Sequence, residues 1–247
     1  MERLGEIKRN NQGSLMKIIE YNSYADITVQ FLDYPYICHS RYGEFKNGMI
    51  KNIYYPSLYG VACVGNATTW ENGKHLQSYV IWQGMIRRCY DEKFKKKHPT
   101  YENCTVCNEW LCYENFKYWY DMNYYEVSNK KDKMCLDKDI FYKNNTIYSP
   151  NTCCFVPNSI NALFKNQCHN NHDISHRKYG YSIYCGRKDK TKKKYIGFTT
   201  NKDEAIKFSN QARTEHLHEI VSQYENQLPY YLYKYLIEYT YEDSYNE

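Results

Sequence analysis

Short runs of alternating apolar and polar residues fill the first part of the chain and are typical of β-strands. Three such runs lie at residues 16–20, 27–31 and 36–39. Polar turn residues, among them Asn22 and Asp33, separate the runs, and Gly48 and Pro56 interrupt the sequence that follows. We therefore expect a small β-rich module over residues 1–72, with a barrel-like sheet.

A helical pattern begins near Ser78. Apolar residues then recur at the i, i+3, i+4 and i+7 spacing of one helix face, at Trp82, Met85, Ile86 and Cys89. Arg87 and Arg88 fall outside this stripe, so we expect both arginines to be free. A second helix is expected over residues 113–123, with three aromatic residues directed inward, Phe116, Trp119 and Tyr120.

The pattern changes again in the last third of the chain. Residues 166–178 have no apolar periodicity and are typical of a linker, whereas "YGYSIYCG" and "KKKYIGFT" alternate like two strands around the basic loop "RKDKTK". Asn201 can then cap a long amphipathic helix, and Pro229 can begin a last short one. The apolar positions of the long helix are Ala205, Ile206, Phe208, Ala212, Leu217, Ile220, Val221 and Tyr224.

Composition places the chain among globular proteins, with 42% hydrophobic and 25% charged residues over 247 positions. The chain is rich in tyrosine, with 30 residues. Tyrosine suits surfaces that stack on bases, but AT-rich coding would produce the same bias, and we prefer this second explanation. A net charge of +5 does not by itself indicate nucleic-acid binding. The basic residues do cluster locally, which favours small positive patches.

Eleven cysteines would suit a secreted disulfide-rich protein, but the start of the chain, "MERLGEIKRNNQ", has no apolar signal core. We therefore expect a reduced, intracellular chain without a membrane segment. Cys104 and Cys107 with Cys153 and Cys154 have zinc-ligand types, but adjacent cysteines on a strand face opposite sides, so we prefer small core residues over structural zinc. Four further ligand types, Cys168, His169, His172 and His176, are interpreted as polar linker.

The central third carries a motif. It runs "YVIWQGMIRRCYDEKFKKKHPTYENCTVCNEWLCYENFKYWY" and then "LDKDIFYKNNTIYSPNTCCFVPNSINALF". This stretch resembles phage-encoded HNH endonucleases of the homing type, in which a strand, a turn, a second strand and a helix form a metal-binding nuclease finger. Residues 179–224 resemble the three-strand-plus-helix DNA-binding domain of the ethylene-response-factor type, which accompanies such nucleases.

The resemblance implies an α+β protein in four segments. These are a β-rich N-terminal module (1–72), an HNH-like ββα-metal nuclease domain with flanking helices (73–165), a linker (166–178) and a three-stranded sheet plus helix that binds DNA (179–247). It further implies one site for Mg²⁺ or Mn²⁺, double-stranded DNA as the partner, and the cytoplasm of a bacterial host as the location.

The same resemblance assigns roles to single residues. Asp137 and Asn161 fall at the places of the two metal ligands, and Lys138 falls where the family has the histidine that activates water. Asp139 follows directly. The residue that holds the loop in shape maps to one of three positions, Asn145, Asn151 or Thr152.

Lys138 raises the question of activity. An ordinary lysine has a pKa of about 10.4, so its neutral, basic form is scarce at neutral pH. Neighbouring carboxylates raise that pKa further, whereas a bound cation would lower it. Three outcomes stay open: a slow enzyme in which Lys138 stabilises charge while solvent or Asp139 takes the proton, an enzyme with a metal-tuned lysine base, and an inactive finger.

Two basic groups are candidates for DNA contact. The sheet-associated group comprises Arg187, Lys188, Lys192, Lys193 and Lys194, and the group beside the finger comprises Arg87, Arg88, Lys95, Lys96 and Lys97. Lysine and arginine can bind phosphates or bases while nearby tyrosines pack against sugars. A solvated, charged hairpin tip is the alternative for the first group.

The expected function is metal-dependent hydrolysis of phosphodiester bonds in double-stranded DNA. The rival hypothesis, motivated by Lys138, is a catalytically inactive phage protein that binds DNA or blocks a host defence component through a protein partner. RNA binding is a third, suggested only by the aromatic content.

Overall fold

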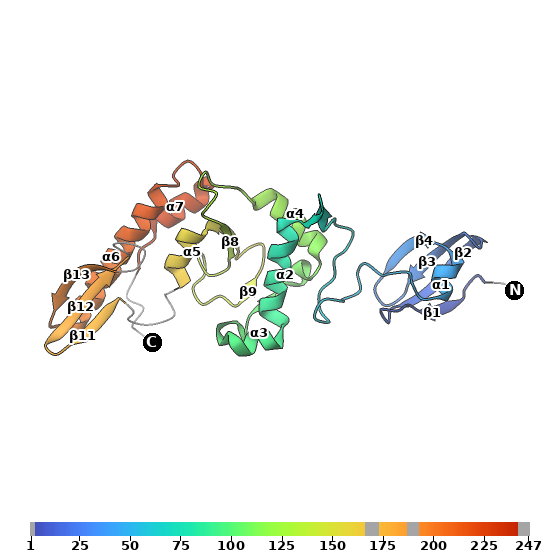
Figure 1. The fold of residues 1–247 in the computed structure, drawn as a ribbon, viewed down its shortest axis with the longest axis horizontal. Coiled ribbons are helices and arrows are strands. Elements are labelled where there is room, and N and C mark those ends of the chain that lie inside the picture. Colours follow the sequence, from blue (N-terminus) through green and yellow to red (C-terminus); the bar gives the residue numbers. More distant parts are fainter. Residues whose placement is uncertain (1–2, 166–172, 187–192, 242–247) are drawn as a thin grey trace. The chain divides into compact units, whose positions relative to one another are not determined.

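The computed structural model describes residues 3–165, 173–186 and 193–241. Helices and several small sheets are mixed along the chain, which makes the protein α+β as expected (Figure 1). Its contacts divide it into two units, each described by itself below. The first unit comprises Met1–Tyr124 and Phe141–Cys153, and the second comprises Tyr125–Ile140 and Cys154–Glu247. The expected boundaries at residues 72 and 165 do not coincide with this division.

The first unit begins with a four-stranded antiparallel sheet in the order β1-β2-β3-β4. Its strands are β1 (Ile7–Arg9), β2 (Leu15–Ser23), β3 (Asp26–Phe31) and β4 (Tyr36–Ser40). Alternation places Met16 and Ile18 of β2 in the core with Val29 and Phe31 of β3, and Phe45 of α1 (Tyr42–Lys46) packs in the same cluster. Three strands were predicted correctly. The strand order makes the described sheet an open one with β1 and β4 at its edges, not the barrel that we expected.

Helices and short strands follow in the first unit. They are β5 (Trp70–Glu71), β6 (Lys74–His75), α2 (Gln77–Tyr90), α3 (Glu92–Lys97), η1 (Pro99–Tyr101), β7 (Thr105–Val106), η2 (Asn108–Leu111), α4 (Tyr113–Asn123) and β9 (Ile147–Tyr148). The predicted stripe of α2 is fully buried. The Trp82 indole donates to the Trp110 carbonyl at 2.7 Å, and Ser78 Oγ lies 2.7 Å from the Tyr113 hydroxyl. These bonds join α2 to η2 and α4.

Two cysteines connect the chain before β5 to the start of α4. Cys63 and Cys112 face each other in an isolated parallel bridge, and the Cys63 amide donates to the Leu111 carbonyl at 2.9 Å. The hydrogen bond between the two thiols lowers the pKa of Cys112 to about 7 and, with burial, raises that of Cys63. The two cysteines do not form a disulfide.

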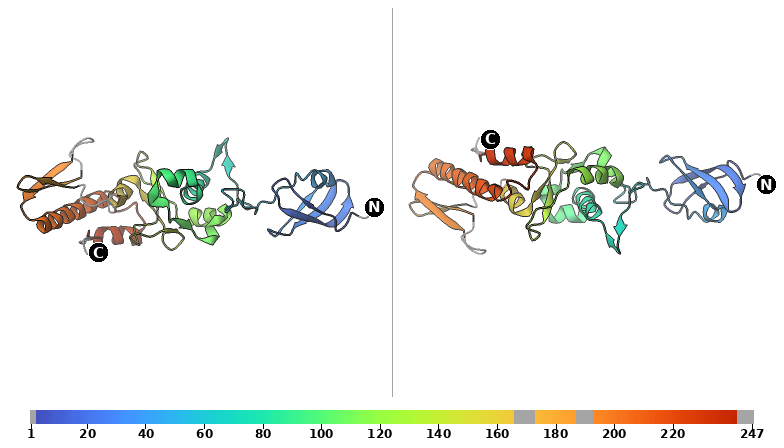
Figure 2. Two further views of the ribbon diagram at one scale, coloured as in Figure 1. Left: turned by 90° about the horizontal axis from the view of Figure 1, so that it is seen from below. Right: turned by 90° about the horizontal axis from the view of Figure 1, so that it is seen from above.

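The described part of the second unit contains two sheets and three helices (Figures 1 and 2). The β8 strand (Met134–Asp137) pairs with β10 (Cys154–Pro157), and α5 (Asn158–Lys165) follows directly. A three-stranded antiparallel sheet has the order β11 (Ile174–Arg177), β12 (Gly180–Cys185), β13 (Lys194–Thr199). Helix α6 (Lys202–Ser222) contacts all three of these strands and also contacts α5 and α7 (Tyr230–Glu238).

The C-terminal predictions were mostly correct. Asn201 caps α6 by accepting the amides of Asp203 and Glu204, and Pro229 stands immediately before α7. Two predictions were wrong. Residues 174–177, assigned to the linker, form β11 at the edge of the sheet, and Phe208, assigned to the core, is 46% exposed.

Tyrosine hydroxyls hold the second unit together. Tyr125 donates to the Phe155 carbonyl at 2.7 Å, Tyr235 to the Ile140 carbonyl at 2.8 Å and Tyr241 to the Leu163 carbonyl at 3.2 Å. Each bond connects a strand or helix to a residue distant in sequence. Part of the tyrosine content therefore has a structural role.

One carboxylate joins three elements of this unit. Asp132, which precedes β8, accepts the Ser159 amide of α5 at 3.0 Å and the Tyr224 hydroxyl that follows α6. The same hydroxyl lies 3.2 Å from Ser159 Oγ. Asp132 therefore satisfies an N-terminal amide of α5 that has no partner within the helix.

Replacing Tyr224 with phenylalanine tests this network. We expect Tyr224→Phe to destabilise α5 locally by about 1 kcal/mol, because one hydrogen bond to a charged acceptor is lost. Hydrogen exchange of the α5 amides, followed by mass spectrometry, should accelerate about fivefold. Tyr230→Phe is the control, since Tyr230 is 79% exposed. Equal exchange in both variants would contradict the assignment.

Candidate functional site

The candidate site lies at the end of a two-stranded hairpin that leads into a helix. The β8–β10 register pairs Asp137 with Cys154 and Met134 with Pro157, so Asp137 and the start of α5 are at opposite ends of the pair. Helix α5 contacts both β8 and β10. Along the chain, β8 is followed by β9, then by β10 and directly by α5.

Asp137 ends β8 with its carboxylate turned into a tight turn. Its Oδ1 accepts the backbone amides of Asp139 at 2.7 Å and Ile140 at 3.0 Å. Such bonds are typical of an Asx turn, which explains why the strand stops here. Burial raises the pKa of Asp137 above its ordinary value, although the two amides oppose the shift. The anionic form thus lacks full compensation within the protein.

Lys138 is buried, with 8% of its surface exposed. Its ammonium donates to both carboxylate oxygens of Asp139, at 2.6 and 2.8 Å. The Asp139 side chain is 45% exposed, so solvent screens one member of the pair. Because the nitrogen lies against a carboxylate, this geometry favours a charge-stabilising role for Lys138 over that of a base.

Asn161 lies on the buried face of α5. It is 4% exposed, and its helix neighbours Ile160 and Phe164 are buried on the same side. The Asn161 Oδ1 has no hydrogen-bond partner among the described residues. An orphaned buried amide oxygen is destabilising, and a cation would satisfy it because hard cations prefer oxygen ligands. This atom is the observation by which Asn161 fits the role of a metal ligand.

Within the described ranges, no group of three or more His, Cys, Asp or Glu side chains could hold a metal ion. Cys104, Cys153 and Cys154 are buried and Cys107 is half-buried. Of the ligand types in the expected linker, His176 lies in β11, and the other three, Cys168, His169 and His172, fall outside the described residues.

The three loop candidates lie in the first unit and differ in their bonding. The Asn145 amide pairs with the backbone of Ile147, donating to its carbonyl at 2.7 Å and accepting its amide at 3.1 Å. Thr152 Oγ1 also donates to the Ile147 carbonyl, at 2.8 Å. Asn151 is exposed, and no hydrogen bond of its side chain is found in the described part of the chain. Asn145 and Thr152 together shape the segment that carries β9.

The basic group beside the finger is only partly available for DNA. We expected Arg88 to be free, and this prediction was wrong. Its guanidinium donates to the Tyr148 hydroxyl at 3.1 Å and lies over the rings of Tyr101 and Tyr148. Arg87 is exposed and forms a 3.6 Å ion pair with Asp91. Lys96 and Lys97 are exposed at the end of α3, and Lys95 is half-buried beside them. Arg88 therefore fixes the fold at β9, whereas the lysines project from the surface.

The sheet-associated basic group lies partly outside the described residues. Its members Arg187, Lys188 and Lys192 fall within 187–192, which the structure does not describe. Lys193 forms a 2.7 Å ion pair with Asp173 and is therefore not a free cation. Lys194 is exposed at the start of β13. Of this group, Lys194 is the described residue whose surroundings suit a phosphate contact.

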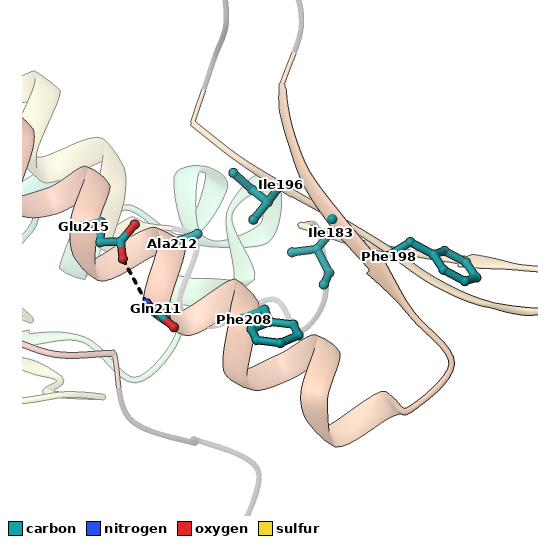
Figure 3. A pocket seen from close by; sticks show the side chains of 8 residues that line it. Ile183, Ile196, Phe198, Phe208, Gln211, Ala212 and Glu215 are labelled. Atoms are coloured by element: carbon teal, nitrogen blue, oxygen red, sulfur yellow. Dashed lines mark hydrogen bonds between the residues drawn. The ribbon is translucent and has the colours of Figure 1, made fainter.

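Strand register defines two faces of the three-stranded sheet. Ile183 and Ile196 face α6, where a pocket of about 350 Å³ also includes Phe208 (Figure 3). Phe198 also lines this pocket, and its ring extends away from Ile183 in the same view. Gln211 and Glu215 of α6 are joined by a 3.0 Å hydrogen bond at this pocket.

The face turned away from α6 is aromatic and basic. Arg177 donates to the Tyr184 hydroxyl at 3.2 Å, and the Tyr184 and Tyr195 rings lie 5.6 Å apart. Gly180, which has no side chain, is the residue opposite Arg177 in the β11–β12 register. A Cβ at Gly180 would lie 2.7 Å from the Phe198 ring, which therefore packs directly over this glycine.

Sequence reasoning missed two residues of interest. Arg177 was hidden because its strand had been interpreted as linker, although two basic residues before Tyr179 could have suggested a sheet edge. Asp132 gave no signal, because its partners, Ser159 and Tyr224, are 27 and 92 residues away.

No helix among the described residues is both long and apolar enough to cross a membrane. Comparison of the chain with models of known protein families, with curated proteins and with solved structures found no match.

Proposed function

We propose that the protein is a metal-dependent endonuclease of the HNH type that hydrolyses phosphodiester bonds in double-stranded DNA. The observation that carries the proposal is the buried Asn161 Oδ1 without a partner, on a helix that packs against the strand ending in Asp137. The helix directly follows the second strand of the hairpin, as in the family that the sequence resembles.

Asp137 and Asn161 would hold one Mg²⁺ or Mn²⁺ ion. Both supply hard oxygen ligands, and a cation would offset the burial that raises the pKa of Asp137. When bound, such an ion supplies charge stabilisation at the scissile phosphate. Asp137 Oδ1 is already engaged by two backbone amides, so Oδ2 is the oxygen left for this role.

Lys138 would stabilise negative charge instead of taking a proton. Its ammonium forms an ion pair with Asp139. The half-exposed Asp139 carboxylate would accept the proton of the attacking water. Since a general base of suitable pKa contributes about 10²–10⁴-fold to rate, its absence predicts a slow enzyme.

Asp137 and Asn161 provide the direct test. We expect purified protein to nick supercoiled plasmid in Mg²⁺ or Mn²⁺, EDTA to abolish nicking, and Asp137→Ala or Asn161→Ala to slow it at least about a hundredfold. Glu225→Gln, an exposed carboxylate of the same unit, is the control. A wild-type protein that neither nicks DNA nor binds Mn²⁺ more tightly than Asp137→Ala would sink the proposal.

A second candidate is a DNA-binding protein without nuclease activity, and the Lys138–Asp139 ion pair is the observation that favours it. Lys138→His separates the two functions. If the rest of the site is competent, the imidazole should raise the nicking rate at least about tenfold, whereas Lys138→Gln, which removes the charge without adding a base, should not. Background rates in both variants would favour the binding protein.

The face of the β11–β13 sheet that is turned away from α6 is the proposed DNA surface. We expect Arg177→Ala to weaken binding to duplex DNA about tenfold, because one guanidinium contact to a base or phosphate is lost. Lys207→Ala is the matched control, since it removes one positive charge from an exposed position on α6. Gel shifts at one fixed salt concentration measure both. Equal losses would mean that only net charge matters, and the assignment of this face would be wrong.

A further inference from the structure

A second pocket lies in the first unit, apart from every residue assigned above. It has a volume of about 540 Å³, and most of its wall comes from one side of α4. The α4 residues concerned are Asn115, Tyr118, Trp119, Met122 and Asn123, which follow the i, i+3, i+4, i+7, i+8 spacing of one helix face. The core face of α4 is a different one, formed by Tyr113, Phe116 and Tyr120.

The pocket exposes large apolar groups. Tyr118 is 72% and Met122 71% exposed, whereas Trp110 at the base is 1% exposed. The Trp110 and Trp119 rings lie 4.7 Å apart at 55° to each other, and Trp110 also packs edge-on against Phe116. The pocket therefore has a fixed aromatic base and an exposed rim that a ligand would cover.

The polar side chains of the pocket include several acceptors. Asn115 donates its amide N–H to the Glu109 carbonyl at 3.0 Å, and Asn123 donates to the Trp119 carbonyl at 2.8 Å. Each asparagine thus has its Oδ1 left as an acceptor. Glu109 adds a carboxylate that forms no ion pair with any residue in the described ranges.

We propose that this pocket binds the guanidinium of an arginine side chain from a partner protein. A planar cation can stack on the Trp119 ring, whose face is electron-rich, while its N–H groups donate to Glu109 and to the two amide oxygens. The methylene stem of an arginine suits the Tyr118 and Met122 rim. A nucleotide fits less well, since its phosphate would lie near the Glu109 carboxylate and its base would meet few donors.

The test uses two capped pentapeptides, Gly-Ser-Arg-Ser-Gly and the same peptide with citrulline, which has nearly the shape of arginine but no charge. Titrations of the full-length protein follow the indole N–H resonances of Trp110 and Trp119 by NMR. We expect the arginine peptide to bind saturably with a Kd in the millimolar range and the citrulline peptide to bind at least about tenfold more weakly.

Two variants connect the binding to the pocket. Glu109→Gln should weaken binding of the arginine peptide about fivefold and leave binding of the citrulline peptide unchanged. Tyr118→Ala should weaken binding of both peptides. Both side chains are exposed, so neither change removes core packing. Glu71→Gln, an exposed carboxylate on β5, is the control for net charge.

Four outcomes would overturn the proposal. These are no saturable shift with the arginine peptide, equal binding of the two peptides, arginine binding that Glu109→Gln leaves intact, and tighter binding of adenosine monophosphate. Free arginine that binds more tightly than the peptide would assign the pocket to a small metabolite instead of a protein. None of these results depends on whether the hairpin cleaves DNA.

Discussion

The Asp132 carboxylate determines where the candidate site can form. It bonds the first turn of α5 and the tyrosine that follows α6, and it stands just before β8 in sequence. The strand that ends in Asp137 and the helix that carries Asn161 therefore share one anchor. Because this carboxylate bonds to partners from distant segments, losing it would loosen the α5 N-terminus and deprive the Ser159 amide of its acceptor.

Local patterns predicted most elements because they depend on spacing alone. The i, i+3, i+4 stripe of Trp82, Met85 and Ile86 identifies α2, and the Asn201 cap marks the start of α6 within one residue. The edge strand β11 escaped notice because it is polar and half-exposed, so burial imposed no alternation on it. Long-range pairs such as Arg88 with Tyr148 escaped for another reason. Their partners are 60 residues apart, and no local rule relates such positions.

The candidate site divides in the same way. Asp137, Lys138 and Asn161 were proposed from a motif, and the structure adds that Asp137 forms an Asx turn. The state of Lys138 could not be assigned, since it depends on burial and on the carboxylate that its ammonium meets. Nor could the orphaned Asn161 oxygen be foreseen, because an unsatisfied atom is a property of the packed interior. The sequence thus identifies the groups, and packing decides their charge and bonding.

The charge of the group explains why lysine can stand at this position. Asp137, Lys138 and Asp139 together carry one net negative charge, which a divalent cation would convert to one positive charge. A phosphodiester carries one negative charge and would neutralise it. With a neutral histidine at the same place, the cation would already be balanced and the phosphate would add an uncompensated charge. In the proposed nuclease, lysine would therefore favour binding of the DNA backbone while it removes the base, and the substitution that slows turnover would strengthen binding of the substrate.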